Sequence, residues 1–492
     1  MKKNLRIPLP LVLAMAIALA LGGCALSAPP AKVATAAPQQ WQAPLPHNGS
    51  VTDLNNWWQH QGDPLLVQLI AAAQSASPSL AAARSRIVQS RAERVAAGAA
   101  LAPALDLAGS IARQNQQSSI PTGTTSQIAL QASWELDVFG AGRAARNAAQ
   151  ARYDIASAGW HEARVSVAAE TANQYYALRA CQQLLLVAVQ DAGSRAYTAR
   201  LSELSSKAGF LSPSDAALAR ASAADGRSRA TAQRAACDIG IKALVALTAM
   251  PEPELRSQLA AGTIAAGQGT AGAPVAATAT ASGTALASAP AIAIEALPAQ
   301  TLSQRPDVYS AEREVAAASY EVGGAQAQRY PRLALSGSVG AANFRTGGEN
   351  TQLDTWTIGP LSVSVPIFDA GRRRANVDAA QARYELAVSQ YQGSVRNAVR
   401  EVEQALVTLN STSERAADAE TALQGYRVAF TATEDRYKNG LASLLDLEDA
   451  RRTRLAAENT VVNLQQERSS AWVALYRAAG GGWTNPVTTN NQ

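Results

Sequence analysis

Histidine, cysteine and methionine are rare in this chain of 492 residues, which has three of each. The three histidines, His47, His60 and His161, lie far apart, so neither a metal-ligand spacing nor a serine-based catalytic constellation surrounds them. A phosphate-binding loop of the form GxxxxGK followed by Ser or Thr is also missing. The sequence therefore gives no support for an enzyme, and we expect neither a metal ion nor an organic cofactor.

Long apolar runs are missing after Cys24, which argues against a membrane-spanning helix in the mature chain. Residues 1–23 carry three positive charges followed by an apolar run, the pattern of a secretory signal. Leu21-Gly22-Gly23-Cys24 resembles the bacterial lipobox, in which the cysteine receives a diacylglycerol on sulfur and an acyl chain on its new amino group. Several acyl chains would anchor the protein stably, and Ala25 after the cysteine indicates the outer membrane. The alternative is an ordinary cleavage site beside an incidental cysteine.

A strong charge of either sign is also lacking. The net charge is +5, and removal of the signal takes three positive charges away, leaving 5 − 3 = +2. So small a charge does not indicate nucleic acid as a partner. Residues 267–272 fit the pattern GxGxxG, but they lie in an Ala/Gly/Thr/Ser-rich region, 257–297, without the strand and helix that a dinucleotide site needs. We interpret that region as a low-complexity linker.

What the chain does have is an internal repeat. Residues 148–250 align with residues 379–481 at a constant offset of 231, and the offset falls to 229 and then 228 upstream. Offsets that change so little indicate two copies of one long structural unit, with small insertions at its turns. Aligned pairs at the constant offset include Glu170/Glu401, Lys207/Lys438, Gly209/Gly440, Asp215/Asp446 and Arg220/Arg451.

Each copy contains two stretches in which apolar and polar residues alternate, as in a strand with one face in lipid and one in water. Pro360 in the last stretch predicts a bulge or a change of phase. Four strands cannot close a barrel, and open edges are not tolerated in lipid, so several chains must combine their strands. On the strands alone, a soluble hairpin on a helical protein is an equal alternative. The predicted strands are residues 104–116, 126–138, 332–344 and 355–366.

Each copy then continues with long helices. From Tyr384 to Tyr437 a heptad pattern runs for eight repeats without a proline, which predicts a coiled-coil helix about 80 Å long at 1.5 Å per residue. That helix stops at Gly440 and a second begins near Ser443, so an antiparallel hairpin forms. In the first copy Gly209 ends the helix, and Ser212 before a proline supplies an N-cap. The predicted hairpins are residues 141–250, with the tip near 209, and 372–480, with the tip near 440.

A helix, two strands and a long helical hairpin, present twice behind a lipobox, resemble the TolC-like outer-membrane efflux channels, in particular their lipoprotein branch, the OprM/NodT type of tripartite RND systems. The resemblance covers residues 57–482 and is strongest in the segments 134–140, 366–374 and 437–446. It implies a mainly α fold with membrane β: a homotrimer that combines four strands per chain into a twelve-stranded barrel, with coiled-coil helices forming a periplasmic tunnel. It also implies two partners, a periplasmic adaptor docked on the tips and an inner-membrane pump of the RND type.

The resemblance assigns roles at the tips. Asp446 and Asp449 lie on one helical face and match the aspartate ring at the periplasmic entrance, where three copies of each would favour cations. Tyr437 matches a tyrosine of the closed-state contacts, and Asp215 is the first-copy counterpart of Asp446. The alternative for Asp446 is that it only stabilises the positive end of its helix. Ala442 stands where some members have a gating arginine, so a closed-state latch here must differ. The expected adaptor-docking residues are Gly209, Ser212, Gly440 and Ser443.

Cys181 and Cys237 each lie 28 residues from Gly209. A hairpin that turns near Gly209 would bring the two cysteines level, and the periplasm is oxidising, so one expectation is a disulfide bond. The other expectation is a pair of small buried thiols. The second-copy counterparts are Thr412 and Arg468, so the pair belongs to the first hairpin only.

The expected function is a passive outer-membrane conduit for the export of small toxic compounds. The alternative is a periplasmic coiled-coil lipoprotein without a pore, either a spacer or an adaptor. Adaptors carry a lipoyl-like β domain between the halves of one hairpin, whereas this chain has two intact hairpins with strand pairs outside them. The expected organisation is a signal peptide (1–23), a lipidated extended segment (24–56), the first repeat (57–256), the linker (257–297), the second repeat (298–482) and a C-terminal tail (483–492).

Overall fold

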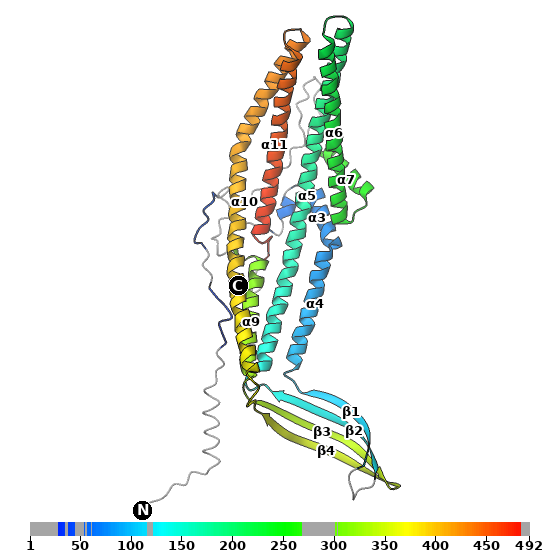
Figure 1. The fold of residues 1–492 in the computed structure, drawn as a ribbon, viewed down its shortest axis with the longest axis vertical. Helices are drawn as coiled ribbons and strands as arrows, with labels where there is room; N and C mark the ends of the chain where they lie inside the picture. The colour runs from blue at the N-terminus through cyan, green and yellow to red at the C-terminus, as the bar shows by residue number, and fades with distance from the viewer. Residues whose placement is uncertain are drawn as a thin grey trace, which may run out of the picture. The chain divides into compact units, whose positions relative to one another are not determined.

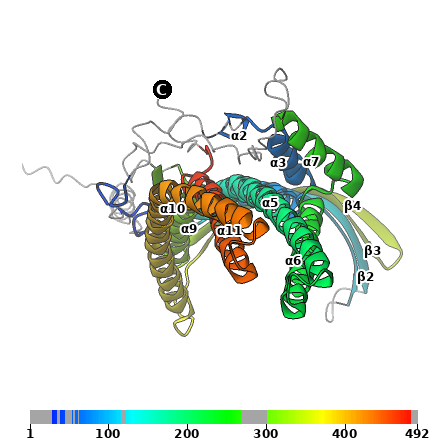
Figure 2. The same cartoon turned by 90° about the horizontal axis from the view of Figure 1, so that it is seen from above.

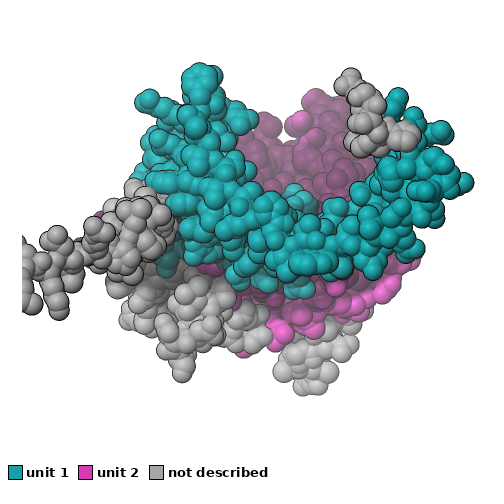
Figure 3. All heavy atoms as spheres, turned by 90° about the horizontal axis from the view of Figure 1, so that it is seen from below, with its two compact units in different colours: residues 1–35, 85–157, 310–393 teal, residues 36–84, 158–309, 394–492 magenta. Residues whose placement is uncertain are grey.

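The computed structural model describes residues 28–34, 38–44, 54, 57–60, 62–115, 122–267, 301–302 and 304–483. The predicted signal peptide, Cys24, most of the predicted linker and the tail beyond residue 483 lie outside these residues. The chain divides into two compact units, drawn in teal and magenta in Figure 3. Residues 1–35, 85–157 and 310–393 form the sheet unit, and residues 36–84, 158–309 and 394–492 form the hairpin unit.

The sheet unit contains a four-stranded antiparallel sheet in the order β1-β2-β3-β4 (Figure 1). Strands that follow one another in the chain are paired, so β2 of the first repeat is hydrogen-bonded to β3 of the second, and β1 and β4 form the two edges. Each strand overlaps one of the four stretches predicted from alternation. The strands are β1 (Ala104–Gln114), β2 (Gly123–Leu136), β3 (Arg332–Thr346) and β4 (Glu349–Ser364).

One face of the sheet is apolar and exposed. The register places Leu107 opposite Leu130, Leu130 opposite Val339 and Val339 opposite Trp356, so these four side chains share a face. In the single chain Leu107 is 70% exposed and Trp356 is 72% exposed. The opposite face carries polar residues such as Gln131. A continuous apolar face of this kind needs a neighbour other than water.

A bulge at Pro360 keeps β4 in phase with the rest of the apolar face. Between the pairs Leu335/Leu361 and Gly337/Ile358, β3 has one residue whereas β4 has two. The extra residue shifts the alternation of β4 by one position, so Ile358 and Leu361 lie on the same face. The bulge predicted from Pro360 is therefore present, at a position where proline has no amide hydrogen to give to the ladder.

Two aspartates start the long helices α5 (Ala141–Lys207) and α10 (Arg372–Lys438), whose first residues belong to the sheet unit. Asp137 accepts a hydrogen bond from the backbone amide of Arg143 at 2.9 Å, and Asp369 accepts one from the amide of Arg373 at 3.2 Å. The same carboxylates pair with the two arginine side chains, which offsets the cost of a cation at the positive helix end. The unit also includes parts of α4 (Pro78–Ala99) and α9 (Pro306–Ala327), and α9 packs on α10 through Val315, Ala318, Val322, Ala380, Tyr384 and Ala387.

Two helical hairpins make up most of the hairpin unit, and Figures 1 and 2 show α5 beside α6 and α10 beside α11. Both first helices end at a glycine in the left-handed region, Gly209 at φ 80° and Gly440 at φ 74°. The next amides, of Phe210 and Leu441, donate to carbonyls five residues earlier at 2.9 and 2.7 Å, which satisfies the helix end. The second helices are α6 (Pro213–Thr248) and α11 (Leu444–Ala478).

Aromatic residues near the end of α11 form the main core of the hairpin unit. Trp57 of α2 (Trp57–His60) stacks on Tyr476, with ring centroids 5.0 Å apart, and Trp58 meets the same ring edge-on at 4.8 Å. Asp63 caps α3 (Pro64–Ala76) and also accepts a hydrogen bond from the hydroxyl of Tyr175. The start of the first repeat is thus fixed to α11 through Tyr476 and to α5 through Tyr175.

Helix α7 (Glu252–Gly267) shows that the linker predicted from residue 257 begins too early. Alanine is the strongest helix former, and Glu252 and Glu254 in the first turn favour the helix dipole, so the Ala-rich stretch continues as a helix. The residues before Gly267 are therefore helical, whereas a dinucleotide site needs a strand there.

No single helix among the described residues is both long enough and apolar enough to span a membrane. Helices α3 and α4 meet the length and composition criteria only when taken together, and they are bent by 51° at their junction.

Candidate functional site

The second helix of each hairpin starts with the same serine–aspartate pair at the tip. Ser443 Oγ accepts a hydrogen bond from the amide of Asp446 at 3.1 Å, and the Asp446 carboxylate accepts one from the amide of Ser443 at 2.9 Å. These reciprocal bonds form a capping box. In the first hairpin, Ser212 Oγ accepts from the amide of Asp215 at 3.1 Å and donates to its carboxylate at 2.8 Å. The serines expected at the tips therefore set the start of α6 and α11.

Asp446 and Asp449, the residues expected to line a gate, already have partners within one chain. Hydrogen bonds from the Ser443 hydroxyl and amide hold the pKa of Asp446 below its usual range. Asp449 pairs with Arg452 at 2.6 Å, and these side chains are 64% and 77% exposed. The alternative role of Asp446, stabilising its own helix end, is the one visible in a single chain. Both residues are nevertheless exposed at the surface of the single chain.

Tyr437 connects the two hairpins close to their tips. Its hydroxyl lies 3.0 Å from the hydroxyl of Ser202 on α5. The ring packs against a small apolar cluster that contains residues from all four hairpin helices: Ala199, Ala219, Ala223, Phe430, Leu444 and Leu447. Tyr437, which the resemblance assigns to closed-state contacts, therefore joins the second hairpin to the first within one chain.

Large apolar side chains are exposed around the two tip glycines. Phe210 is 88% exposed, and Leu441 and Leu445 are each 69% exposed. Side chains of this size in contact with water at the end of a helical hairpin indicate a surface that another molecule covers.

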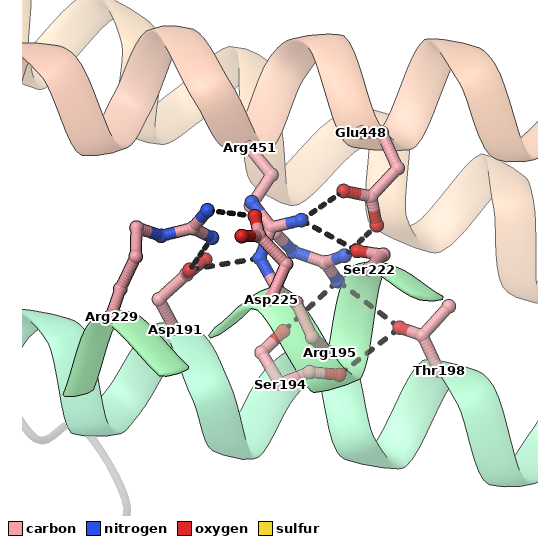
Figure 4. Close-up of polar contacts among 9 residues, drawn as sticks. All are labelled: Asp191, Ser194, Arg195, Thr198, Ser222, Asp225, Arg229, Glu448 and Arg451. Carbon is pink, nitrogen blue, oxygen red and sulfur yellow. Dashed lines mark hydrogen bonds and ion pairs between the residues drawn. The ribbon is translucent and has the colours of Figure 1, made fainter. Parts of the chain in front are cut away.

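A buried network of charges lies behind the tips and joins α5, α6 and α11 (Figure 4). Its centre is Arg451 of α11, whose side chain is 0% exposed. The Arg451 guanidinium donates to the hydroxyls of Ser194 and Thr198 on α5, both at 3.1 Å, and pairs with Glu448 one turn earlier. Burial lowers the pKa of Arg451, and the Glu448 carboxylate opposes that shift.

Arg195 of α5 completes the link between the hairpins. Its guanidinium pairs with Asp191 at 2.8 Å, donates to Ser222 of α6 at 2.6 Å and pairs with Glu448, which therefore serves both buried arginines. Asp191 and Arg195 are 2% and 8% exposed. Gly226 makes room for Arg195, because a Cβ at that position would lie 2.8 Å from the arginine Cδ. Two further members extend the network on α6, where Arg229 pairs with Asp191 and Asp225.

A disulfide bond joins Cys181 of α5 to Cys237 of α6, with Cα atoms 5.6 Å apart, within the range that disulfides require. Their second-repeat counterparts, Thr412 and Arg468, instead line a cavity of about 280 Å³ between α10 and α11, together with Trp472. The two hairpins thus differ at the same level, because the first is cross-linked and the second has a pocket between its helices.

The histidines provide no site in the part of the chain that the structure describes. His161 packs against the rings of Trp160 and Trp483, and burial lowers its pKa. Among the described residues, no three His, Cys, Asp or Glu side chains are grouped so that they can hold a metal ion.

The buried network was not predicted from the sequence. Two local signals exist, since Asp191 and Arg195 are four residues apart and Glu448 and Arg451 are three apart, as in surface ion pairs of single helices. Those spacings are equally common on solvated helix faces. The network forms because α11 packs against α5. That packing depends on how the two hairpins fit together, and no sequence pattern within one hairpin predicts it.

Comparison with known proteins shows similarity to outer membrane efflux proteins along nearly the whole chain. The profile of the outer membrane efflux protein family matches residues 69–249 and 297–481, one match for each repeat. The chain is 28% identical to the solvent efflux pump outer membrane protein SrpC of Pseudomonas putida, with 94% of this chain and 96% of SrpC aligned. It is also 28% identical to the pyoverdine export outer membrane protein OpmQ of Pseudomonas aeruginosa, with 94% and 95% aligned.

Solved structures show the same fold. The outer-membrane channel OprN superposes with a TM-score of 0.76 at 25% identity, over 92% of this chain and 99% of OprN. The Campylobacter jejuni CmeC outer membrane channel superposes with a TM-score of 0.78 over 95% and 98% of the two chains, and at 21% identity it is evidence for the fold alone.

Proposed function

This chain belongs to the outer membrane efflux protein family, and we propose that three copies of it form a passive conduit that exports small toxic compounds through the outer membrane. The observation that carries the proposal is the sheet, which has unpaired edges at β1 and β4 and an exposed apolar face. Lipid would suit the apolar face but not the edges, because unpaired backbone groups are costly in hydrocarbon. Three copies joined edge to edge would leave no open edge in a closed twelve-stranded barrel.

The duplicated hairpins suit a tunnel on the periplasmic side of that barrel. Each chain supplies two hairpins of nearly equal length, since α5 and α10 both have 67 residues. Three chains then supply six similar hairpins around one axis. We propose the repeat boundaries 57–256 and 298–482 for these units, with the linker between them shortened at its start by α7.

The exposed tips are the proposed docking site for a periplasmic adaptor, which would couple the conduit to an inner-membrane pump of the RND type. Phe210 and Leu441 follow Gly209 and Gly440 at matching positions and present apolar side chains to water. The relatives named for solvent and pyoverdine export are consistent with small organic cargo. The conduit itself needs no source of energy in this scheme.

Asp446 and Asp449 are the proposed gate of the closed conduit. Six carboxylates from three chains around a narrow opening would focus a negative potential and favour cations. Tyr437 would hold the second hairpin near the first in the closed state, through its contact with Ser202. Asp215 would contribute a second, weaker ring from the first hairpins.

Cys24 is the proposed attachment site for lipid, following removal of residues 1–23. Contacts of the segment that follows Cys24 support this proposal. The carbonyls of Pro29 and Pro30 accept hydrogen bonds from Ser319 and Tyr384, so the segment is attached to the sheet unit. An acylated Cys24 only a few residues earlier would then stay close to the membrane that the sheet spans.

Reconstitution of the full-length protein in planar lipid bilayers tests the proposed function. The expected result is a trimer, identified by cross-linking, that conducts ions without any added pump. A protein that remains monomeric, or a trimer that conducts no ions, would favour the alternative of a periplasmic coiled-coil spacer or adaptor.

A further inference from the structure

Two arginines lie side by side on one face of the sheet, separated by a single strand. Pairing across the four strands forms a row of Arg113 on β1, Thr124 on β2, Arg345 on β3 and Asn350 on β4. Neighbouring strands are about 4.8 Å apart, so the Cα atoms of the two arginines are separated by about 10 Å. Every member of this arginine row can donate hydrogen bonds, and none is a carboxylate.

The arginine row lies on the apolar face of the sheet. Arg113 follows Leu107 by six residues on β1, and Arg345 follows Val339 by six residues on β3. An even separation along a strand places side chains on the same face. In the proposed conduit this is the face that contacts lipid, so both arginines point away from the pore.

The connections of the strands show which end of the sheet carries the row. At one end β2 leads into α5 and β4 leads into α10, whereas the turns between β1 and β2 and between β3 and β4 lie at the other end (Figure 1). Arg113 and Arg345 are each the last residue but one of their strand, next to these turns. The helices face the periplasm in the proposed conduit, so the arginine row faces the cell exterior.

The height of the row matches the outer surface of the membrane. Leu333 belongs to the same face and lies twelve residues before Arg345 on β3. That distance is about 40 Å along the strand, or about 30 Å along the membrane normal for a strand tilted by about 40°. The apolar band of an outer-membrane barrel is about 25 Å tall. A band that begins at Leu333 therefore ends just below the arginines, which reach the lipid headgroups of the outer leaflet.

Both arginines are available to a ligand. They are exposed, and neither guanidinium has an ion-pair or hydrogen-bond partner in the part of the chain that the structure describes. Asp354 is the carboxylate of the four strands that shares their face, but it lies four residues from Asn350 along β4. Its Cα is therefore about 14 Å from that of Arg345, too far for an ion pair. Two unpaired cations beside lipid favour an anionic group of the membrane itself.

We propose that Arg113 and Arg345 bind the phosphate groups of lipid A, the glycolipid of the outer leaflet. The inference rests on the trimeric conduit proposed above, in which three such rows surround the barrel. Lipid A carries two phosphates at opposite ends of a disaccharide, and each guanidinium can hold a phosphate through two parallel hydrogen bonds. Thr124, between the arginines, adds a hydroxyl donor. A phospholipid with one phosphate would engage only one arginine at a time.

Titration of the full-length trimer with diphosphoryl lipid A, followed by native mass spectrometry, tests the proposal. EDTA is included so that divalent ions cannot bridge protein and phosphate. The variant R113Q/R345Q is compared with R329Q/R332Q, which removes the same charge from exposed positions near the helical end of β3. We expect the apparent Kd for lipid A to rise about tenfold or more in R113Q/R345Q, because two charge-assisted contacts are lost, and to change by less than about twofold in the control.

The choice of lipid distinguishes lipid A from other anionic lipids. We expect the unsubstituted trimer to bind monophosphoryl lipid A and phosphatidylglycerol more weakly than diphosphoryl lipid A, because one phosphate leaves one arginine unpaired. Phosphatidylglycerol that binds as tightly as diphosphoryl lipid A, and loses as much affinity in R113Q/R345Q, would contradict the assignment to lipid A.

Conductance in phospholipid bilayers without lipid A separates this inference from the proposed function. R113Q/R345Q should form trimers that conduct like the unsubstituted protein. R345Q alone, a smaller change, should weaken lipid A binding by an intermediate amount and provides the same test if the double variant forms no trimers. If the unsubstituted chain conducts but binds lipid A no better than R113Q/R345Q does, the inference is wrong and the function stands. If it forms no conducting trimer, both are wrong.

Discussion

The most informative single residue is Arg451, a charged side chain without solvent exposure. Arginine stays charged under all conditions that a protein tolerates, so its burial requires acceptors. Glu448, Ser194 and Thr198 supply them from two helices. The position of α11 against α5 is therefore specified by chemistry as well as by apolar packing.

Glu448 should matter more to stability than Arg451. E448Q leaves Arg451 with hydroxyls only, and an unpaired buried charge costs about 3–5 kcal/mol. R451M removes one cation and keeps the apolar stem, while Glu448 retains Arg195, so we expect a smaller loss. Hydrogen exchange of the backbone amides in α11 measures both effects. E467Q, in an exposed pair, should cost about 1 kcal/mol or less.

The capping box at the second tip should weaken in acid. Because hydrogen bonds from Ser443 lower the pKa of Asp446, the ionised form is the one that favours the folded tip. That contribution is present above the ordinary carboxyl pKa and is lost as the pH falls through the lowered value. We expect the protection factors of the first amides of α11, which compare each exchange rate with the intrinsic rate at the same pH, to fall below about pH 4, whereas in D446N they should not change with pH in that range. A parallel response of the two proteins would contradict this assignment.

At the scale of helices and strands, the sequence predicted the structure correctly wherever neighbouring residues determine it. Gly209 and Gly440, each in the left-handed conformation, and the N-caps Ser212 and Ser443 mark the ends of helices that the heptad pattern predicts. Pro360 likewise marked the bulge. The sequence was misleading at α7, because an Ala-rich stretch without charge has the composition of a linker and the propensity of a helix. The buried network needed knowledge of which hairpin faces which, and that information lies in packing between distant segments.

The disulfide should stabilise only the first hairpin. We expect C181S/C237S to lower the stability of α5 and α6 by about 2–4 kcal/mol, measured by hydrogen exchange, with little change in α10 and α11. T412C/R468C places the same pair at the equivalent level of the second hairpin, where a cavity now lies. Under oxidising conditions that variant should protect α10 and α11 from exchange, and reductant should abolish the protection. Protection that survives reduction would exclude a disulfide as its cause.

At the scale of the whole molecule, the two repeats have hairpins of similar length but different side chains at equivalent positions. The two hairpins have matching length, but the first is cross-linked by Cys181 and Cys237, and the buried network joins it to the second within one chain. Duplication followed by divergence therefore gives the two hairpins different chemistry on a similar backbone.

The proposed gate leads to a prediction that separates charge from capping. D446N/D449N removes the negative charge at the second tip but keeps side-chain oxygens that can still cap α11. Three chains would lose six charges around the opening, so we expect the preference for cations over anions to fall, measured as the reversal potential in a salt gradient. D435N removes an equally exposed carboxylate, 64% exposed, near the end of α10 and serves as the control. Because a structural role for Asp446 survives in the amide variant, unchanged selectivity in D446N/D449N would mean that these two residues do not line the pore.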